Sequence, residues 1–173
     1  FRVFTINNRD FPDPKRMNKY LHDNGFHSVY MIDPGVKVDD NYFVYKTGKE
    51  QNAFVCDIYR NEFHGKVWPG ACAFPDFTRP ETRTWWSGLY KDFMANGIDG
   101  IWNDMNEPSV FDGPGGTMPE NNIHLGGGNL PIGSHLMYHN AYGRLMVEAS
   151  YNGMMAANPS KRPFLLSRSN IIG

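Results

Sequence analysis

The stretch "IDGIWNDMNEPS", residues 98–109, decides how the fold of this 173-residue chain is interpreted. Its first five residues form a mostly apolar run that is too short for a helix and suits a buried β-strand. Because side chains alternate along a strand, Trp102 and Asp104 are expected on the same side of it. Pro108 then prevents a helix from continuing. The stretch therefore predicts a strand that ends on a carboxylate beside an indole ring, with a polar segment after it that contains Asn103, Asn106 and Glu107.

Two further strands of the same kind are expected, at 27–32 and 163–167, and a helical pattern precedes each of the three strands. Proline at the first helical position and glycine after the last turn delimit the first two helices, at about 14–24 and 80–96. A third helix is expected from about 134 to 157. Alternating helices and apolar strands predict an α/β fold with a parallel sheet and helices packed outside it.

Two connections that follow strands are long, at about 36–78 and 109–133. Such loops lie at the carboxyl ends of parallel strands, where α/β folds carry their chemistry. The first contains alternating runs at 41–46, 53–60 and 63–68 and is expected to form a small antiparallel β lobe. The second is rich in Gly, Pro and Asn and is expected to be irregular.

The number of helix–strand units limits the architecture. Three units cannot close a (β/α)8 TIM barrel, which has eight strands and typically about 250 residues. An open sheet of three strands would also leave two edges unpaired. We therefore expect residues 1–173 to be a fragment of a larger domain.

Composition narrows the classes of partner. A formal net charge of -1, with 20% charged residues, gives no basic surplus for nucleic acid or an anionic membrane surface. No stretch approaches the roughly 20 apolar residues of a membrane-spanning helix. The two cysteines, Cys56 and Cys72, have neither disulfide-framework nor zinc-ligand spacing, so reduced thiols are expected.

Neither a metal nor an organic cofactor is expected. Asp104, Asn106 and Glu107 offer oxygen ligands, but Pro108 and Ser109 stand where a calcium loop needs another ligand and a glycine. The six histidines lack the paired spacing of metal ligands, and structural or surface roles are expected for His22, His27, His64, His124, His135 and His139.

Two interpretations of the carboxylates remain open on spacing alone. In the first interpretation, Asp104 is a turn-forming residue and Glu107 is an ion-pair partner. In the second, Asp104 lies in the crevice at the carboxyl end of the sheet as a catalytic group. An anionic oxygen beside an indole suits attack on the anomeric carbon of a sugar, which becomes cationic in the transition state.

Several stretches resemble, in the same order, glycoside hydrolase family 31, the α-glucosidase family. The similarity covers essentially all 173 residues, and the WNDMNE form resembles the α-glucosidase branch, which includes glucosidase II-like enzymes. The resemblance implies that the chain is the central segment of a catalytic (β/α)8 barrel. It rests on "FPDPKRMNKYLHDNGFHSVYMIDPG", "VWPG", "FPDFTRPETRTWWS", "IWNDMNEPS", "HNAYGRLMVEASYNGM" and "KRPFLLSRS".

The resemblance also implies roles for individual residues. Asp104 matches the catalytic nucleophile, whereas Glu107 resembles a structural acid. The other matching positions are expected to bind substrate: Trp68, Trp102 and Met105 around the glucosyl ring, Phe111 at the border of the aglycone position, Arg168 near the nucleophile as a hydrogen-bond donor to the sugar, and Asp33 as a residue that shapes the site.

The implied reaction is that of a retaining α-glucosidase, which removes terminal α-linked glucosyl residues from oligosaccharides through a covalent intermediate on Asp104. The family's general acid/base lies in a Gly-Asp-Asn stretch expected beyond Gly173, so the chain alone is expected to be inactive. The family's Asp-x-Asp-Tyr-Met strand is expected upstream of Phe1. "SRSNIIG", residues 167–173, departs from the commoner Ser/Thr-Phe-Ala/Pro after the arginine.

Two alternatives stay open. The chain could belong to a non-catalytic carbohydrate-binding relative that keeps the Trp68 and Trp102 walls, or to a transglycosylase or lyase that keeps Asp104. The sequence indicates neither the linkage preference, nor the oligomeric state, nor the cellular compartment.

Overall fold

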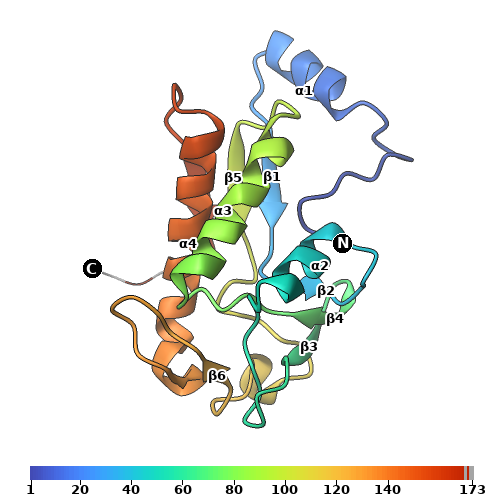
Figure 1. The fold of residues 1–173 in the computed structure, drawn as a ribbon. Helices are drawn as coiled ribbons and strands as arrows, with labels where there is room; N and C mark the ends of the chain where they lie inside the picture. Colours follow the sequence, from blue (N-terminus) through green and yellow to red (C-terminus); the bar gives the residue numbers. More distant parts are fainter. Residues whose placement is uncertain (170, 172–173) are drawn as a thin grey trace.

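A computed structural model describes residues 1–169 and 171; the departure from the family pattern at Asn170, Ile172 and Gly173 lies outside the described residues. Its centre is a parallel sheet of three strands in the order β1-β5-β8 (Figure 1). The strands are β1 (Val29–Ile32), β5 (Gly100–Asn103) and β8 (Phe164–Ser167). All three lie where the sequence predicted them, and both pairings are parallel, as expected.

Three helices precede these strands: α1 (Pro14–Asp23), α3 (Pro80–Met94) and α4 (His135–Ala157). The predicted proline starts are confirmed for α1 and α3, and the side chain of Asp13 caps α1 by accepting a hydrogen bond from the backbone N–H of Arg16. α3 and α4 lie side by side over one face of the sheet (Figure 1). They are linked by hydrogen bonds such as that from Tyr90 Oη to Ser150 Oγ, at 2.8 Å.

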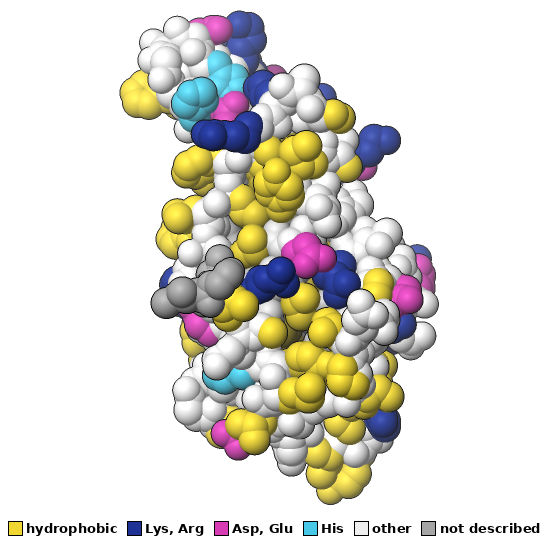
Figure 2. All heavy atoms as spheres, turned by 90° about the vertical axis from the view of Figure 1, so that its left-hand side faces the viewer, with side chains coloured by type: hydrophobic (Ala, Val, Ile, Leu, Met, Phe, Trp, Pro, Cys, Tyr) yellow, Lys and Arg dark blue, Asp and Glu magenta, His cyan; other side chains and the backbone are white. Residues whose placement is uncertain are grey.

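The two faces of the sheet differ in exposure. Side chains such as Ile32 and Ile101 are buried on the face that α3 and α4 cover, and they join the main hydrophobic core. Met31, Trp102 and Leu166 occupy one level of the other face and are exposed. On the side of the molecule drawn in Figure 2, exposed hydrophobic side chains gather in patches between charged groups. The period of two along the strands therefore places Trp102 outside the core.

The first long loop forms the predicted antiparallel lobe. Its sheet has the order β2-β4-β3, with β2 (Val36–Lys37), β3 (His64–Val67) and β4 (Gly70–Ala73). The alternating run at 63–68 is thus confirmed as a strand. The run at 53–60 makes only isolated bridges, at Phe54 and Cys56.

The expected extended run at 41–46 is wrong, because this segment enters helix α2 (Phe43–Glu50). Val44, Tyr45 and Gly48 are its buried residues, a spacing that fits one face of a helix. Strand-like alternation would have exposed Tyr45 next to the buried Val44. Packing therefore overrides the apparent period of two.

The second long loop is largely irregular, as predicted. It holds a short 3₁₀ turn (Pro114–Gly116) and one two-residue ladder between β6 (Ile123–His124) and β7 (Gly133–Ser134). Both cysteines are free thiols, and Cys72 is buried. In the part of the chain that the structure describes, no helix is both long and apolar enough to cross a membrane.

Candidate active site

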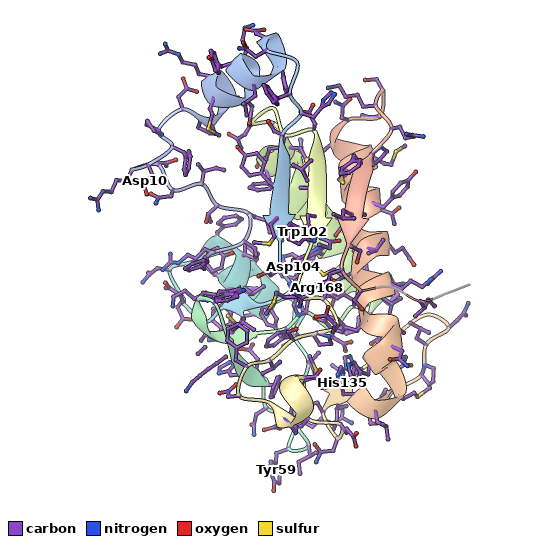
Figure 3. The ribbon with its side chains drawn as sticks, turned by 180° about the vertical axis from the view of Figure 1, so that it is seen from behind. Asp10, Tyr59, Trp102, Asp104, His135 and Arg168 are labelled. Atoms are coloured by element: carbon purple, nitrogen blue, oxygen red, sulfur yellow. The ribbon has the colours of Figure 1, made fainter. Side chains whose placement is uncertain are left out.

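The three parallel strands end in a row of charged side chains. Asn103, the last residue of β5, pairs in register with the last residues of β1 and β8. The next residues along the three strands are Asp33, Asp104 and Arg168, which we call the strand-end row. Backbone hydrogen bonds continue the register into this row, from Asp104 N to Ile32 O at 3.4 Å and from Arg168 N to Asn103 O at 3.0 Å. Figure 3 shows Asp104 and Arg168 close to Trp102.

A pocket of about 420 Å³ opens beside this row. Four residues predicted for the site line it: Asp33, Trp68, Trp102 and Asp104. The expectation that Trp102 and Asp104 share one side of their strand is therefore confirmed. The remaining lining residues come from the start of the chain, the strand β1 and the lobe: Phe1, Arg2, Val3, Met31, Gly35 and Pro69.

Asp104 keeps one carboxylate oxygen out of the hydrogen-bond network. The residue is only 8% exposed. Its Oδ1 lies 3.1 Å from Nη1 of Arg168, an ion pair, but no donor within the described residues makes a hydrogen bond of good geometry to this oxygen. Buried polar atoms in folded proteins are normally satisfied, so an unsatisfied carboxylate oxygen on a residue that lines a pocket points to a ligand or a reacting group.

The Arg168 guanidinium is held by a second carboxylate. Nε donates to Glu107 Oε1 at 2.7 Å and Nη2 to Glu107 Oε2 at 2.8 Å, the bidentate geometry that suits an arginine fork. Nη2 also lies 3.0 Å from Ser109 Oγ. These hydrogen bonds from Arg168 lower the pKa of Glu107 to about 2. Glu107 is therefore an ionised anchor for Arg168, which supports the prediction of a structural acid.

The chain turns sharply directly after Asp104. Met105 has a φ of 58°, the left-handed region that a residue with a side chain seldom adopts. Its side chain is buried, and its Sδ accepts from Nη2 of Arg168 at 3.3 Å. Met105 is not one of the residues that line the pocket, so its assignment to the glucosyl subsite stays a prediction.

Asn106 fixes the loop that carries Arg168. Its Nδ2 donates to Ser167 Oγ at 2.9 Å, and its Oδ1 accepts from the backbone N–H of Ser169 at 3.3 Å. The fully buried amide thus holds the neighbours of Arg168 on both sides. No spacing rule reveals this role, because the partners are 61 and 63 residues away in the sequence.

Asp33 differs electrostatically from its neighbours. Burial, together with the nearby charge of Asp104, raises the pKa of Asp33 to about 6, although Arg168 acts in the opposite direction. Its Oδ1 is buried and has no hydrogen-bond partner in the described part of the chain. The pocket therefore contains a second carboxyl group whose protonated form is favoured below about pH 6.

Two exposed aromatic rings, Trp68 and Phe111, pack against each other beside the strand ends. Trp68 and Phe111 meet edge to face with their centroids 4.9 Å apart, and they are 55% and 54% exposed. A backbone hydrogen bond from Phe111 to Lys66, at 2.8 Å, joins the two long loops at this point. Only Trp68 of the pair lines the pocket, so the place of Phe111 at the aglycone border stays a prediction.

The described residues contain no group of three or more His, Cys, Asp and Glu side chains that could hold a metal ion. His124 and His135, for which structural roles were expected, are buried and hydrogen-bonded to each other, with 3.0 Å between Nε2 and Nδ1.

Comparison with known proteins places this geometry in a family. The family model described as "Glycosyl hydrolases family 31 TIM-barrel domain" matches residues 1–173. Alpha-glucosidase 2 of Bacillus thermoamyloliquefaciens is 43% identical over 173 residues, which are 100% of this chain and 22% of that protein.

Solved structures agree with this placement. A family 31 alpha-glucosidase from Bacteroides thetaiotaomicron is 53% identical, with a TM-score of 0.80, over 98% of this chain and 26% of that one. A glucosidase II alpha subunit described as alpha3-Glc2-bound is 37% identical, with a TM-score of 0.88, over 98% of this chain and 18% of that one. The chain thus spans about a quarter or less of the length of these relatives, which are named α-glucosidases. It belongs to glycoside hydrolase family 31 and contains part of that family's TIM-barrel domain.

Proposed function

We propose that the protein is a retaining α-glucosidase in which Asp104 is the nucleophile, acting on terminal α-linked glucosyl residues of oligosaccharides. The observation that carries this proposal is that Asp104 lines a pocket at the strand ends while its buried Oδ1 atom receives no hydrogen bond from the described residues. The names of the relatives support the substrate class, including the subunit described as alpha3-Glc2-bound.

In the proposed first step, Asp104 attacks the anomeric carbon and forms a β-linked glycosyl ester while the bond to the aglycone oxygen breaks. A second carboxylic acid about 5–5.5 Å away protonates the departing oxygen and then removes a proton from the water that hydrolyses the ester. Arg168, whose Nη1 lies 3.1 Å from Oδ1 of Asp104, holds a positive charge beside the proposed nucleophile.

The residues that line the pocket suggest which side chains contact the substrate. Trp68 and Trp102 offer aromatic surface to the apolar faces of the glucosyl ring, and Asp33 lies on the adjacent strand end. Since the acid/base is expected beyond Gly173, we expect the 173-residue chain by itself to leave aryl and disaccharide α-glucosides intact.

Mechanism-based labelling tests the proposal in the full-length protein. A 5-fluoro-α-glucosyl fluoride traps the ester intermediate, and mass spectrometry of peptides locates it. We expect the label on Asp104 and its loss in Asp104→Asn. A label on Glu107 would show that the nucleophile is assigned wrongly, and glucoside binding without any label would favour a non-catalytic binding protein.

A further inference from the structure

A series of hydrogen-bonded polar side chains, buried except for the half-buried Thr117 at its end, runs through the long loops toward the strand-end row. It begins at Asp76, which is fully buried and accepts hydrogen bonds from His124 Nδ1 at 2.9 Å, Thr78 Oγ1 at 2.5 Å and Leu125 N at 2.6 Å. Burial acts to raise the pKa of Asp76, but the hydrogen bonds from His124 and Thr78 lower it below its ordinary value. Asp76 is therefore an ionised acceptor that orients the ring of His124.

The series continues through two imidazoles. His124 Nε2 lies 3.0 Å from His135 Nδ1, and both rings are fully buried. Burial, with His124 and His139 close by, lowers the pKa of His135 to about 3, so this ring is neutral. A neutral imidazole has one N–H and one bare nitrogen, so its hydrogen-bonded neighbours determine how it is oriented.

The last members of the series reach the loop after Asp104. His135 Nε2 lies 3.5 Å from Thr117 Oγ1, and this hydroxyl donates to the carbonyl of Pro108 at 2.6 Å. Pro108 is buried and follows Glu107, the residue that grips Arg168. Figure 3 shows His135 at the start of α4, well below the Asp104–Arg168 group, so the series of polar side chains spans the space between them.

We propose that Asp76, His124, His135 and Thr117 are positioning residues, which set the Glu107–Pro108 segment and thereby hold Arg168 against Asp104. The proposal rests on the proposed function and adds residues that do not touch the sugar. Segments that are distant in sequence are linked in series, and the last member, Thr117, contacts the Pro108 carbonyl. The contacts between Glu107, Arg168 and Asp104 carry that placement to the pocket. Effective catalysis requires such groups to be held within a fraction of an ångström.

A matched pair of variants of the full-length protein tests this. Thr117→Val removes the hydroxyl at constant shape, whereas Thr117→Ser keeps it. We expect Thr117→Val to lower kcat for an aryl α-glucoside about tenfold with little change in KM, because loss of alignment acts on the transition state. Thr117→Ser is expected to restore kcat. Equal kcat values for wild type and Thr117→Val, or equal losses in both variants, would overturn the proposal.

A double-mutant cycle separates positioning from general destabilisation. If Thr117 acts through Glu107, the loss in kcat for Thr117→Val and Glu107→Gln together should be clearly smaller than the product of the single losses. Multiplicative losses would contradict the proposal. If Thr117→Val does not fold, His135→Gln takes its place in the cycle with the same criteria.

The same assays separate failure of this proposal from failure of the proposed function. Absence of a label on Asp104 in the wild-type protein counts against the function itself. A labelled and active wild type whose Thr117→Val variant is equally active counts against the positioning series alone.

Discussion

Asp104 and Asp76 are two buried carboxylates with opposite surroundings. Asp76 lies among the long loops and receives hydrogen bonds on both oxygens from Thr78, His124 and Leu125. Asp104 lies at a strand end, faces a pocket, and has one oxygen with only an ion-pair partner, Arg168. The carboxylate with hydrogen bonds on both oxygens fits a role in stabilising the scaffold, and the one with an unsatisfied oxygen fits the proposed role as nucleophile.

The two carboxylates at the ends of β5 sharpen the same contrast. Asp99 precedes the strand and accepts from the backbone N–H of Ser28 at 2.8 Å, with His22 Nε2 at 2.6 Å. These contacts belong to the amino-terminal end of the sheet, where barrel folds use polar groups for stability. Asp104, at the carboxyl end, faces the pocket instead.

The largest effect is expected for Asp104→Asn in the full-length protein. Loss of the attacking oxygen should lower kcat by at least about 10⁴-fold, as removal of a catalytic nucleophile does elsewhere. The thermal midpoint should stay close to that of the wild type, because no hydrogen bond to Oδ1 is lost and Arg168, which loses its ion pair with Asp104, keeps its bidentate contact with Glu107. Steady-state kinetics and a thermal melt check both points.

Asp99→Asn is the matched control at the opposite end of the strand. It should lower stability and leave kcat close to the wild-type value. Comparable kcat losses in Asp99→Asn and Asp104→Asn would contradict the assignment of catalysis to the carboxyl end of β5 alone.

The next largest effect is expected for Arg168→Lys. Lysine keeps the charge but cannot donate two parallel hydrogen bonds to Glu107, so the cation loses its orientation toward Asp104. We expect kcat/KM to fall about 100-fold. Arg144→Lys, on the exposed surface of α4, is the control and should have no effect. Wild-type kcat/KM in Arg168→Lys would show that the fork geometry is irrelevant.

Asp76→Asn should act mainly on stability. In the variant, the amide N–H₂ group faces donors that bind the Asp76 carboxylate in the wild type, and the buried hydrogen bond with His124 is disrupted. We expect the free energy of unfolding to fall by about 3 kcal/mol. Chemical denaturation measures this. A variant as stable as the wild type would show that the hydrogen bonds to Asp76 do not stabilise the scaffold.

The smallest effect is expected for Asp33→Asn, and it depends on pH. The folded protein holds the Asp33 proton up to about pH 6, whereas the carboxyl of an unfolded chain loses it near 3.8. The contribution of the protonated Asp33 carboxyl to the free energy of unfolding is therefore fully present below about pH 4 and is lost as pH rises through 6. Asp33→Asn should be more stable than the wild type at pH 7, by about 1 kcal/mol after allowance for solvent screening.

The same variant should show no such gain at pH 4, where the wild-type carboxyl is protonated in both states. Thermal melts across this range check the sign. A gain of equal size at both pH values would mean that the ionisation of Asp33 is not its cause.

Much of the fold could be predicted from the sequence, because its helices and strands carry strong local signals. Pro14 and Pro80 mark helix starts, and the three apolar runs became the parallel strands. The segment 41–46 could not be placed correctly, since Tyr42 and Val44 mimic strand alternation while Tyr45 and Gly48 complete a helical face. The strand period and the helix period make different predictions only for residues such as Tyr45 and Gly48, and the packing of these residues selects the helix.

The candidate site was predictable only in part. The place of Asp104 and Trp102 follows from a strand end and the period of two, and both line the pocket. The contacts of Arg168 and the polar series from Asp76 to Thr117 link residues that are far apart in the sequence. No local pattern encodes such contacts, because they arise when separate loops are folded onto each other.

Chemical rescue of Asp104→Gly tests the central claim most directly. With α-glucosyl fluoride as substrate and sodium azide as external nucleophile, azide should take the place of the missing carboxylate and attack from the face opposite the leaving group. The account predicts azide-dependent turnover and a β-glucosyl azide product, identified by nuclear magnetic resonance. If Asp104→Gly formed an α-glucosyl azide, or hydrolysed the substrate at the wild-type rate without azide, the nucleophile would be another residue.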